Sequence, residues 1–263
     1  VRRDRINLRE FIPLSMETYQ WGDTMWGFPY SGFPIMTFYS PQLFEEAGLA
    51  SPYDLGDEWT WDEVMRAAKR LTVLKPGEDT PIQYGVQFRW DDLSRMGIWV
   101  HQAGGSFFDR LINPQASRFN SPEAVRAISW MNDVTRAGVV SPNTNYDELV
   151  TNTTGIVLHG GPYIFGRQAF QPTMGQLSVP IGVARMPRGP EHNGTVFFSD
   201  AWMITSSSAS QEAAWKWLKF IATDVEHARR FAQLTGRVPT MIRALPDYVR
   251  LLPNGVLNGQ TIA

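Results

Sequence analysis

The sequence GIVLHGGPYIFG, residues 155–166, joins an apolar run to an abrupt stop and then to an aromatic residue. Residues 155–158 predict a short buried strand, because an unbroken apolar run of this length suits a strand covered on both faces. Gly160-Gly161-Pro162 ends that strand, since Pro donates no backbone hydrogen bond. Two interpretations of Tyr163 stay open: a core aromatic after a turn, or a flat ring that the strand end holds against a ligand.

Strands and helices alternate on both sides of this stretch. Capping side chains accept hydrogen bonds from the first N–H groups of a helix and so mark where helices begin. The expected caps are Ser40, Thr60 (in a capping box with Glu63), Ser121, Ser210 and Asp224. A further helix is expected at 97–103, and strands are expected at 35–39, 82–88, 195–198 and within 179–190. The alternation favours an α/β fold with mostly parallel strand pairing.

The composition restricts the class of protein. The 263 residues are 43% hydrophobic and 19% charged, as in an ordinary globular chain with one large domain or two lobes. The net charge of −2 gives no electrostatic reason to expect nucleic acid as a partner. The chain has no Cys, so disulfides, thiolate catalysis and Cys-ligated metals are excluded. Because the chain begins with Val1, a processed or truncated N-terminus is expected.

Sequence motifs that mark catalysis or a cofactor are missing. There is no G-x-S-x-G elbow, Walker loop or H-E-x-x-H pair, and the four His residues lack ligand spacing, so neither metal nor cofactor is expected. The carboxylates leave one alternative open. Asp91 follows Trp90, and Asp200 lies in an apolar context close to Trp202. Two carboxylates on either side of a sugar bond would be glycosidase chemistry.

Several motifs carry a resemblance to a known family. Two early ones are FYSPQLFEEAGL (38–49) and WTWDEVMRAAKRLT (59–72). The later ones are AGGSFFD (103–109) with FNSPEAVRAISWM (119–131), GIVLHGGPYIFG (155–166), SSSASQEAAWKWLKFIAT (206–223) and TGRVPTM (235–241). In this order they resemble the extracellular solute-binding proteins of ABC importers, in the sugar-binding group that includes the maltose-binding proteins.

Some residues depart from the family pattern. Ser40 and Pro41 stand where the family usually has Asn and Lys, and Tyr163 stands where it usually has Trp. The first strand–helix units of the family have no counterpart, and the closing helices end at Ala263. The chain therefore looks like the middle and later part of a longer protein.

The resemblance implies a periplasmic-binding-protein-like α/β fold of two lobes joined by a hinge, with the first lobe incomplete. The chain would cross the hinge near residues 31–34, 197–199 and 237–240. Residues 1–33 and 199–238 would be the remnant of the N-terminal lobe, and residues 34–198 and 239–263 would be the C-terminal lobe. Such a remnant is expected to expose apolar side chains that a complete lobe covers.

The resemblance also implies a function, that of a binding protein and not an enzyme. The chain would be the substrate-binding component of an ABC importer, closing on a sugar or oligosaccharide and delivering it to the transmembrane permease subunits. It would be a monomer outside the cytoplasm, in the periplasm or as a membrane-anchored lipoprotein on the cell surface. The alternatives are a glycosidase that uses Asp91 and Asp200, and the same fold with a non-sugar solute.

A sugar offers apolar C–H faces and a rim of hydroxyl groups, which aromatic rings and charged side chains bind. By the resemblance, Tyr163 is the stacking ring, and Gly161 lets the backbone approach the ligand. Asp200 and Arg237, each near a hinge crossing, are expected at the rim, because charge-assisted hydrogen bonds are stronger than neutral ones. The other expected ligand contacts are Tyr30, Trp90, Asp91, Trp99 and Trp202.

Overall fold

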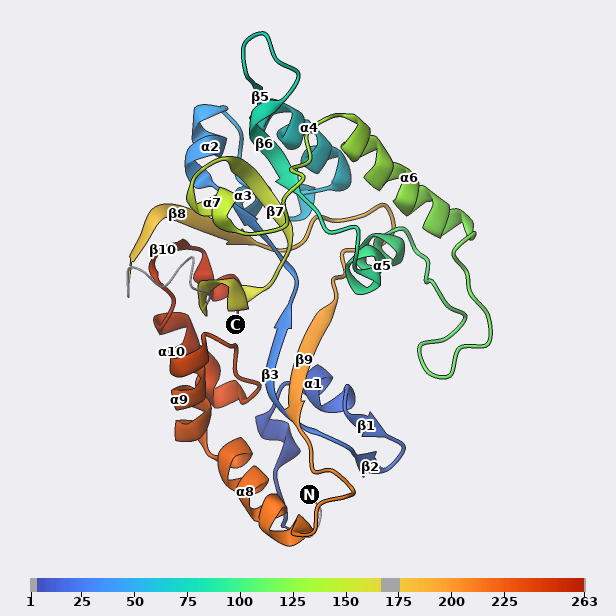
Figure 1. The fold of residues 1–263 in the computed structure, drawn as a ribbon, viewed down its shortest axis with the longest axis vertical. Helices are drawn as coiled ribbons and strands as arrows, with labels where there is room; N and C mark the ends of the chain where they lie inside the picture. Colours follow the sequence, from blue (N-terminus) through green and yellow to red (C-terminus); the bar gives the residue numbers. More distant parts are fainter. Residues whose placement is uncertain (1–3, 167–175, 263) are drawn as a thin grey trace.

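Two strands, β3 (Phe28–Pro34) and β9 (Phe197–Trp202), run antiparallel through the middle of the molecule and connect its two lobes. The computed structural model describes residues 4–166 and 176–262. In Figure 1 the upper lobe is built on one large sheet, and the lower lobe holds β3, β9, two short strands and helices near the N-terminus. This is the two-lobed α/β architecture expected from the sequence.

The upper sheet is mixed in direction. Within the described residues it has six strands in the order β10-β8-β4-β7-β6-β5. Their bounds are β4 (Met36–Tyr39), β5 (Val73–Leu74), β6 (Pro81–Gln87), β7 (Thr154–Gly160), β8 (Gln176–Ala184) and β10 (Asn254–Leu257). The pairs β10–β8 and β6–β7 are parallel, whereas β4 is antiparallel to both its neighbours and β5 is antiparallel to β6.

The prediction of mostly parallel pairing is therefore wrong, and the path of the chain gives the reason. β4 begins where the chain arrives from the lower lobe, whereas β7 and β8 end there. Met36, at the start of β4, pairs with Gly160, at the end of β7. Thr37 likewise pairs with Ala184, at the end of β8. The central strand leaves the hinge while its neighbours return to it.

The helices with a predicted capping residue begin where that residue indicated. The side chains of four caps accept the expected backbone bonds, Ser40 for α2 (Pro41–Glu46), Thr60 for α4 (Trp61–Leu71), Ser121 for α6 (Pro122–Arg136) and Asp224 for α9 (Val225–Thr235). The other α-helices of the described residues are α1 (Pro13–Glu17), α3 (Pro52–Leu55), α5 (Leu93–Gln102), α7 (Asp147–Val150), α8 (Gln211–Thr223) and α10 (Leu245–Arg250).

Three details of these helices differ from the prediction. Ser210 precedes α8 but makes no side-chain cap bond. Glu63, expected to reach back to Thr60, pairs its carboxylate with Arg66. The helix expected at 97–103 begins earlier, because Asp92 accepts hydrogen bonds from the first N–H groups of α5.

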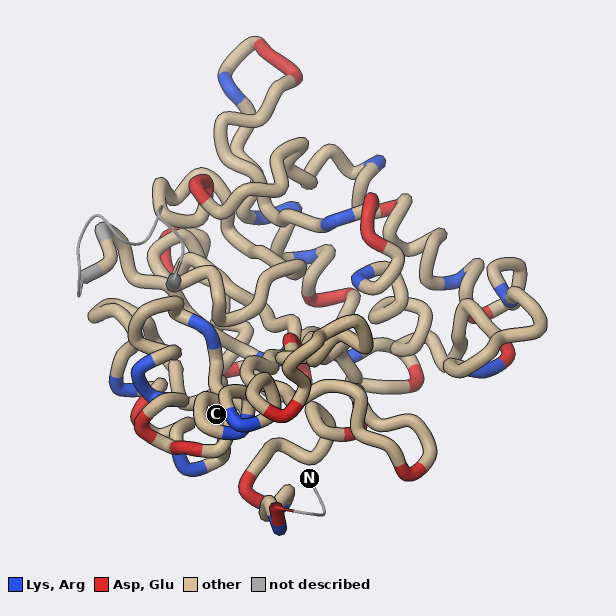
Figure 2. The backbone as a smooth tube through the Cα atoms, turned by 60° about the horizontal axis from the view of Figure 1, so that its bottom comes forward, with Lys and Arg blue, Asp and Glu red and all other residues tan. Residues whose placement is uncertain are grey.

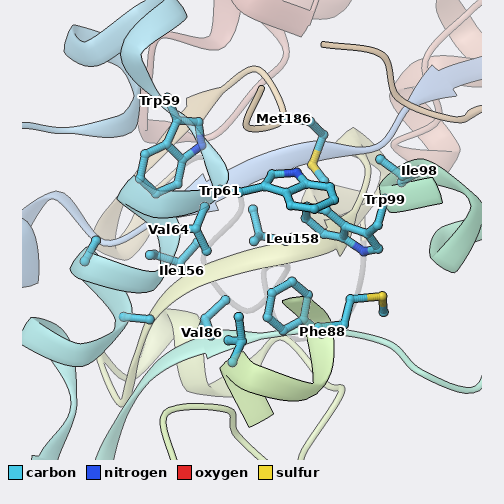
Figure 3. Close-up of a cluster of buried hydrophobic side chains, with 14 of the residues drawn as sticks. Trp59, Trp61, Val64, Val86, Phe88, Ile98, Trp99, Ile156, Leu158 and Met186 are labelled. Carbon is cyan, nitrogen blue, oxygen red and sulfur yellow. The ribbon is translucent and has the colours of Figure 1, made fainter. Parts of the chain in front are cut away.

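Strand β7 presents alternate side chains to two apolar clusters, one on each face of the upper sheet. Ile156 and Leu158 belong to the cluster shared with α4, α5 and α6, and Val157 belongs to the other. Figure 3 shows the first cluster, in which Trp61 and Trp99 lie close to Leu158. Burial on both faces explains why this strand is apolar without alternation, and the predicted buried strand is confirmed.

Three segments far apart in the sequence lie side by side between the lobes. Ser31 of β3 pairs with Asp200 of β9 on one side and forms a bridge to Pro239 on the other. Gly32 donates its N–H to the carbonyl oxygen of Val238, 3.2 Å away. These contacts bring together the three stretches that the sequence analysis expects as hinge crossings.

The surface carries charged residues of both signs, and large apolar side chains are exposed on both lobes, for example Leu74 and Leu111 on the upper one. Lys and Arg positions are interspersed with Asp and Glu positions along the backbone (Figure 2). Within the described residues, no helix has both the length and the apolar character that crossing a bilayer requires. The lower part of the molecule exposes several large apolar side chains, namely Trp21, Trp26, Met203, Trp217, Phe220 and Leu234.

Candidate functional site

Tyr163 lies at the hinge, just past the end of β7. All seven residues of β7 are buried, and the 3-10 turn η3 (Pro162–Gly166) follows it closely. The half-buried Tyr163 ring packs edge-on against Phe33 of β3, with ring centroids 4.8 Å apart. Its hydroxyl lies 3.0 Å from the hydroxyl of Tyr146. A rigid strand end therefore holds a partly exposed ring where the lobes meet.

Gly161 makes room for a neighbouring strand. A Cβ atom at this position would lie 2.4 Å from Cδ2 of Phe33 and 3.2 Å from the carbonyl oxygen of Pro34. Real Cβ atoms do not approach other atoms so closely, so packing against β3 requires glycine here. The resemblance predicts a different role for this glycine, close approach of the backbone to a ligand.

Phe198 and Arg95 extend this group of side chains, and neither is among the ligand contacts predicted from the sequence. Phe33 stacks on Phe198 of β9, with ring centroids 5.9 Å apart. The Arg95 guanidinium lies over the Phe198 ring, 5.0 Å from its centroid, which is within cation–π range. We call these four residues the hinge cluster: Phe33, Arg95, Tyr163 and Phe198.

Arg95 is held in place by two further contacts. Its Nε donates a hydrogen bond to the carbonyl oxygen of His159 at 2.8 Å, and its guanidinium pairs with Asp92. The Arg95 side chain is only 11% exposed. One side chain thus joins the start of α5, the end of β7 and the crossing strand β9. The available signal in the sequence was an Arg in the first turn after the capping residue Asp92.

His159 is buried beside the hinge cluster as a neutral residue. It is 1% exposed. Its Nε2 lies 3.3 Å from Oε1 of Gln87, whose amide nitrogen donates to Glu148, so Nε2 is the donor. Its Nδ1 has no partner among the described residues. Burial, followed by the positive charges of Arg95 and Arg89, lowers the pKa of His159 to about 3.

The three ligand contacts expected in or just before α5 do not all lie at the surface, since Trp90 and Asp91 are exposed and Trp99 is buried. Asp91 forms a two-point ion pair with Arg89, at 3.0 and 2.9 Å, and its side chain is 67% exposed. Trp90 is 38% exposed, with its ring near that of Phe88. Trp99 is only 2% exposed and packs in the core, in edge contact with Trp61 and Phe88. The structure thus places Trp99 away from the surface, because its side chain completes the apolar cluster under the upper sheet.

Four of the residues expected to bind ligand gather in the lower lobe. Tyr30 packs on Trp202, with ring centroids 4.5 Å apart. Asp200 pairs with Arg237, and both side chains are about two-fifths exposed, at 39% and 41%. Burial, with a further contribution from the charge of Asp200, raises the pKa of Tyr30. We call this group the lower cluster: Tyr30, Asp200, Trp202 and Arg237.

A groove of about 500 Å³ opens beside the lower cluster, between β3 and the helices α8 and α9. Tyr30 and Trp202 line one side of it, and Trp217, Phe220 and Leu234 line the other. The lining is mostly apolar and offers few partners for hydroxyl groups. The groove therefore fits an apolar surface better than it fits a sugar.

The geometry gives no support to acid catalysis by Asp91. A glycosidase needs one carboxylic acid with a raised pKa. The hydrogen bond from Arg89 instead lowers the pKa of Asp91. Among residues 4–166 and 176–262, no three His, Asp or Glu side chains are close enough together to hold a metal ion.

The chain matches a protein-family model and a curated relative. Residues 9–228 match the family described as bacterial extracellular solute-binding protein. The Brucella abortus (strain 2308) protein named "Putative binding protein BAB2_0491" is 24% identical over 220 residues, which are 81% of this chain and 50% of that protein. The chain thus spans about half the length of this curated relative.

Solved structures share the fold at low sequence identity. The ABC substrate-binding protein Lmo0181 from Listeria monocytogenes, in complex with cycloalternan, matches 99% of this chain and 64% of its own at 22% identity, with a TM-score of 0.82. A Thermotoga lettingae solute-binding protein bound with α-D-tagatose is 20% identical, with a TM-score of 0.75. The match covers 99% of this chain and 69% of the Thermotoga chain. UgpB from Mycobacterium tuberculosis, in complex with glycerophosphocholine, is 14% identical, with a TM-score of 0.76. The match covers 95% of this chain and 61% of the UgpB chain.

The family match covers well over half of the chain and agrees with the two-lobed fold described above. The motifs of residues 38–49, 59–72 and 155–166 lie inside the matched range. The chain therefore belongs to the bacterial extracellular solute-binding protein family.

Proposed function

We propose that this chain is the solute-binding component of an ABC importer, that it binds a sugar or oligosaccharide between its lobes, and that it delivers this ligand to the transmembrane permease subunits. The hinge cluster carries the proposal, because it presents the partly exposed Tyr163 ring beside the charged Arg95. Aromatic rings bind the C–H faces of sugars, and charged donors bind their hydroxyl groups. The sugars bound to the Listeria and Thermotoga proteins support this ligand class.

Members of this family bind solutes outside the cytoplasm and are not enzymes. We place this chain either in the periplasm or on the cell surface as a lipoprotein. The proposed lobes are residues 1–33 with 199–238, and residues 34–198 with 239–263. They meet at the three segments that lie side by side around Ser31.

We propose ligand contacts that agree with the geometry described above. Tyr163 and Arg95 bind the sugar directly, with Trp90 and Asp91 at the entrance to α5 and with Asp200 and Arg237 at the rim. Trp99 is left out because it is 2% exposed. Gly161 contributes by letting Phe33 pack under Tyr163. Tyr30 and Trp202 face the apolar groove, so we propose for them a supporting role.

Titration calorimetry tests the proposal. The panel contains cycloalternan, maltose, tagatose and glycerophosphocholine, and the sugars are analysed chromatographically afterwards. Because the chain covers 64% of the Listeria protein, the protein produced from the complete coding sequence is titrated in parallel with residues 1–263. We expect saturable binding of a sugar that is recovered intact. Binding of glycerophosphocholine alone would identify a non-sugar transporter component, and sugar cleavage would identify an enzyme.

A further inference from the structure

The side chain of Tyr146 lies between the end of β7 and Tyr163. Tyr146 directly precedes α7 and is 5% exposed. Its ring stacks on His159, with centroids 5.2 Å apart and planes at 27°. A Cβ on Gly160 would lie 2.9 Å from Cε1 of the same ring, so glycine at that position gives the ring its space. The last residues of β7 therefore fix Tyr146 closely.

Tyr146 in turn contacts Tyr163. The two hydroxyl oxygens lie 3.0 Å apart, which is within hydrogen-bond distance. The two rings meet edge-on, with centroids 6.4 Å apart and planes at 78°. Phe33 packs against the Tyr163 ring as well. The ring is thus held by its hydroxyl and by contacts with two neighbouring rings, and Tyr163 stays partly exposed.

We propose that Tyr146 is a positioning residue, which fixes the ring of Tyr163 in the orientation that stacks on a sugar. This inference rests on the proposed function. Tyr163 has two torsion angles in its side chain, and a hydrogen bond at the far end of the ring restricts both. A ring that is already oriented loses less conformational entropy when the ligand binds. The same bond directs the Tyr163 hydroxyl towards Tyr146, and the contact that we propose for the ligand is the aromatic face of Tyr163.

The variant Tyr146→Phe keeps the ring between His159 and Gly160 and removes only the hydroxyl. We expect sugar affinity to fall about three- to tenfold, the scale of losing one neutral hydrogen bond. The matched control is Tyr39→Phe, which removes another buried tyrosine hydroxyl, on β4 and in a different apolar cluster. Tyr39→Phe should leave affinity unchanged, whatever it does to the melting temperature.

A double-mutant cycle separates positioning from general stability. Tyr163→Phe removes the other hydroxyl of the pair, and it should lower affinity as much as Tyr146→Phe. The double variant Tyr146→Phe/Tyr163→Phe should lose no more than either single variant, because the hydrogen bond is already gone. Additive losses would overturn the inference. A large loss in Tyr163→Phe with none in Tyr146→Phe would also overturn it, because the Tyr163 hydroxyl would then bind the sugar itself.

A ligand-free measurement distinguishes failure of this inference from failure of the proposed function. In protein labelled with ¹³C at the tyrosine rings, the NMR signals of Tyr163 should shift and average in Tyr146→Phe but not in Tyr39→Phe. If they change and no sugar binds to the wild type, the positioning contact stands and the proposed function fails. If they do not change, Tyr146 does not position Tyr163, with or without a bound sugar.

Discussion

Replacing Tyr163 by Ala tests the stacking role directly. The ring is half-buried at the hinge. We expect the variant to weaken sugar binding by ~1–3 kcal/mol, the scale of losing a well-packed aromatic contact. Calorimetry measures this loss, and Tyr53→Ala, at an exposed position on α3, is the control. Wild-type affinity together with a lowered melting temperature would instead identify Tyr163 as a core residue.

The buried His159 predicts how stability depends on pH. Its pKa is about 3 in the folded protein, below the ordinary value of about 6.5 in an unfolded chain. Between these values the unfolded chain binds a proton that the folded chain excludes, so stability falls as pH falls from 6.5 towards 3. The slope for one group approaches ~1.4 kcal/mol per pH unit.

Urea unfolding at pH 7, 5 and 4 measures this dependence, with His159→Gln as the comparison. The variant cannot titrate but can still donate to Gln87. Its free energy of unfolding should vary less between pH 7 and 4 than that of the wild type. Equal pH dependence in both proteins would show that other groups control stability in acid.

Asp200 tests the rim of the proposed site. Its ion pair with Arg237 is about two-fifths exposed, and exposed pairs contribute little to stability, typically ~0–1 kcal/mol. Asp200→Ala should therefore change the melting temperature little but weaken sugar binding measurably. Arg250→Ala, which removes an exposed ion pair to Asp247 on α10, is a matched control. Unchanged affinity in Asp200→Ala would remove Asp200 from the site.

At the scale of secondary-structure elements, the sequence predicted where helices begin but not the directions in which distant strands pair. Ser40, Thr60, Ser121 and Asp224 each precede a helix whose first turn needs a hydrogen-bond acceptor, so the sequence contains the whole signal. The direction of β4 depends on where β7 and β8 end, and no residue of β4 encodes that.

The candidate site shows the same division. Tyr163 follows a strong stop signal and was predictable as a strand-end aromatic. The contacts of Phe33 and Arg95 depend on β3, α5 and β9 meeting at the hinge, which spacing along the chain does not reveal. Trp99 falls within the helix expected at 97–103, which left a core position and a ligand contact both open, and the structure shows the core position, at 2% exposure.

The junction of β7 and η3 also predicts a packing defect. In Gly161→Ala the new methyl group would meet the Phe33 ring at 2.4 Å, and forcing an extra carbon into a packed site typically costs ~1–3 kcal/mol. We expect a lower melting temperature and weaker sugar binding. Gly97→Ala, on helix α5, is the control, because its Cβ would lie 3.9 Å from the nearest atom, Cε2 of Phe107, which is an ordinary contact distance. Gly161→Ala should lower stability less in a Phe33→Ala background than in the wild type, because the ring that the methyl group meets is gone, and an equal loss in both backgrounds would argue against this clash.

At the scale of the whole molecule, the apolar groove predicts a measurable property of residues 1–263. Trp217 and Phe220 line the groove and are more than half exposed, at 63% and 55%. Exposed apolar surfaces of this kind bind hydrophobic dyes. Trp217→Gln/Phe220→Gln should lower the fluorescence of bound ANS strongly, whereas Leu111→Gln, at a 95%-exposed position that does not line the groove, should not. Equal fluorescence in all three proteins would mean that the dye binds elsewhere.

The contacts around β3 also set the order in which the chain can fold during its synthesis. Phe11 forms a bridge with Met241, and Ile12 donates its N–H to the carbonyl oxygen of Thr240. A ribosome adding ~5–20 residues per second needs roughly 10–45 s to make the ~230 residues between these partners. In the apolar cluster shown in Figure 3, the last buried member in chain order is Met186. The upper lobe can thus pack one face of its sheet before the partners of Phe11 and Ile12 have been synthesised.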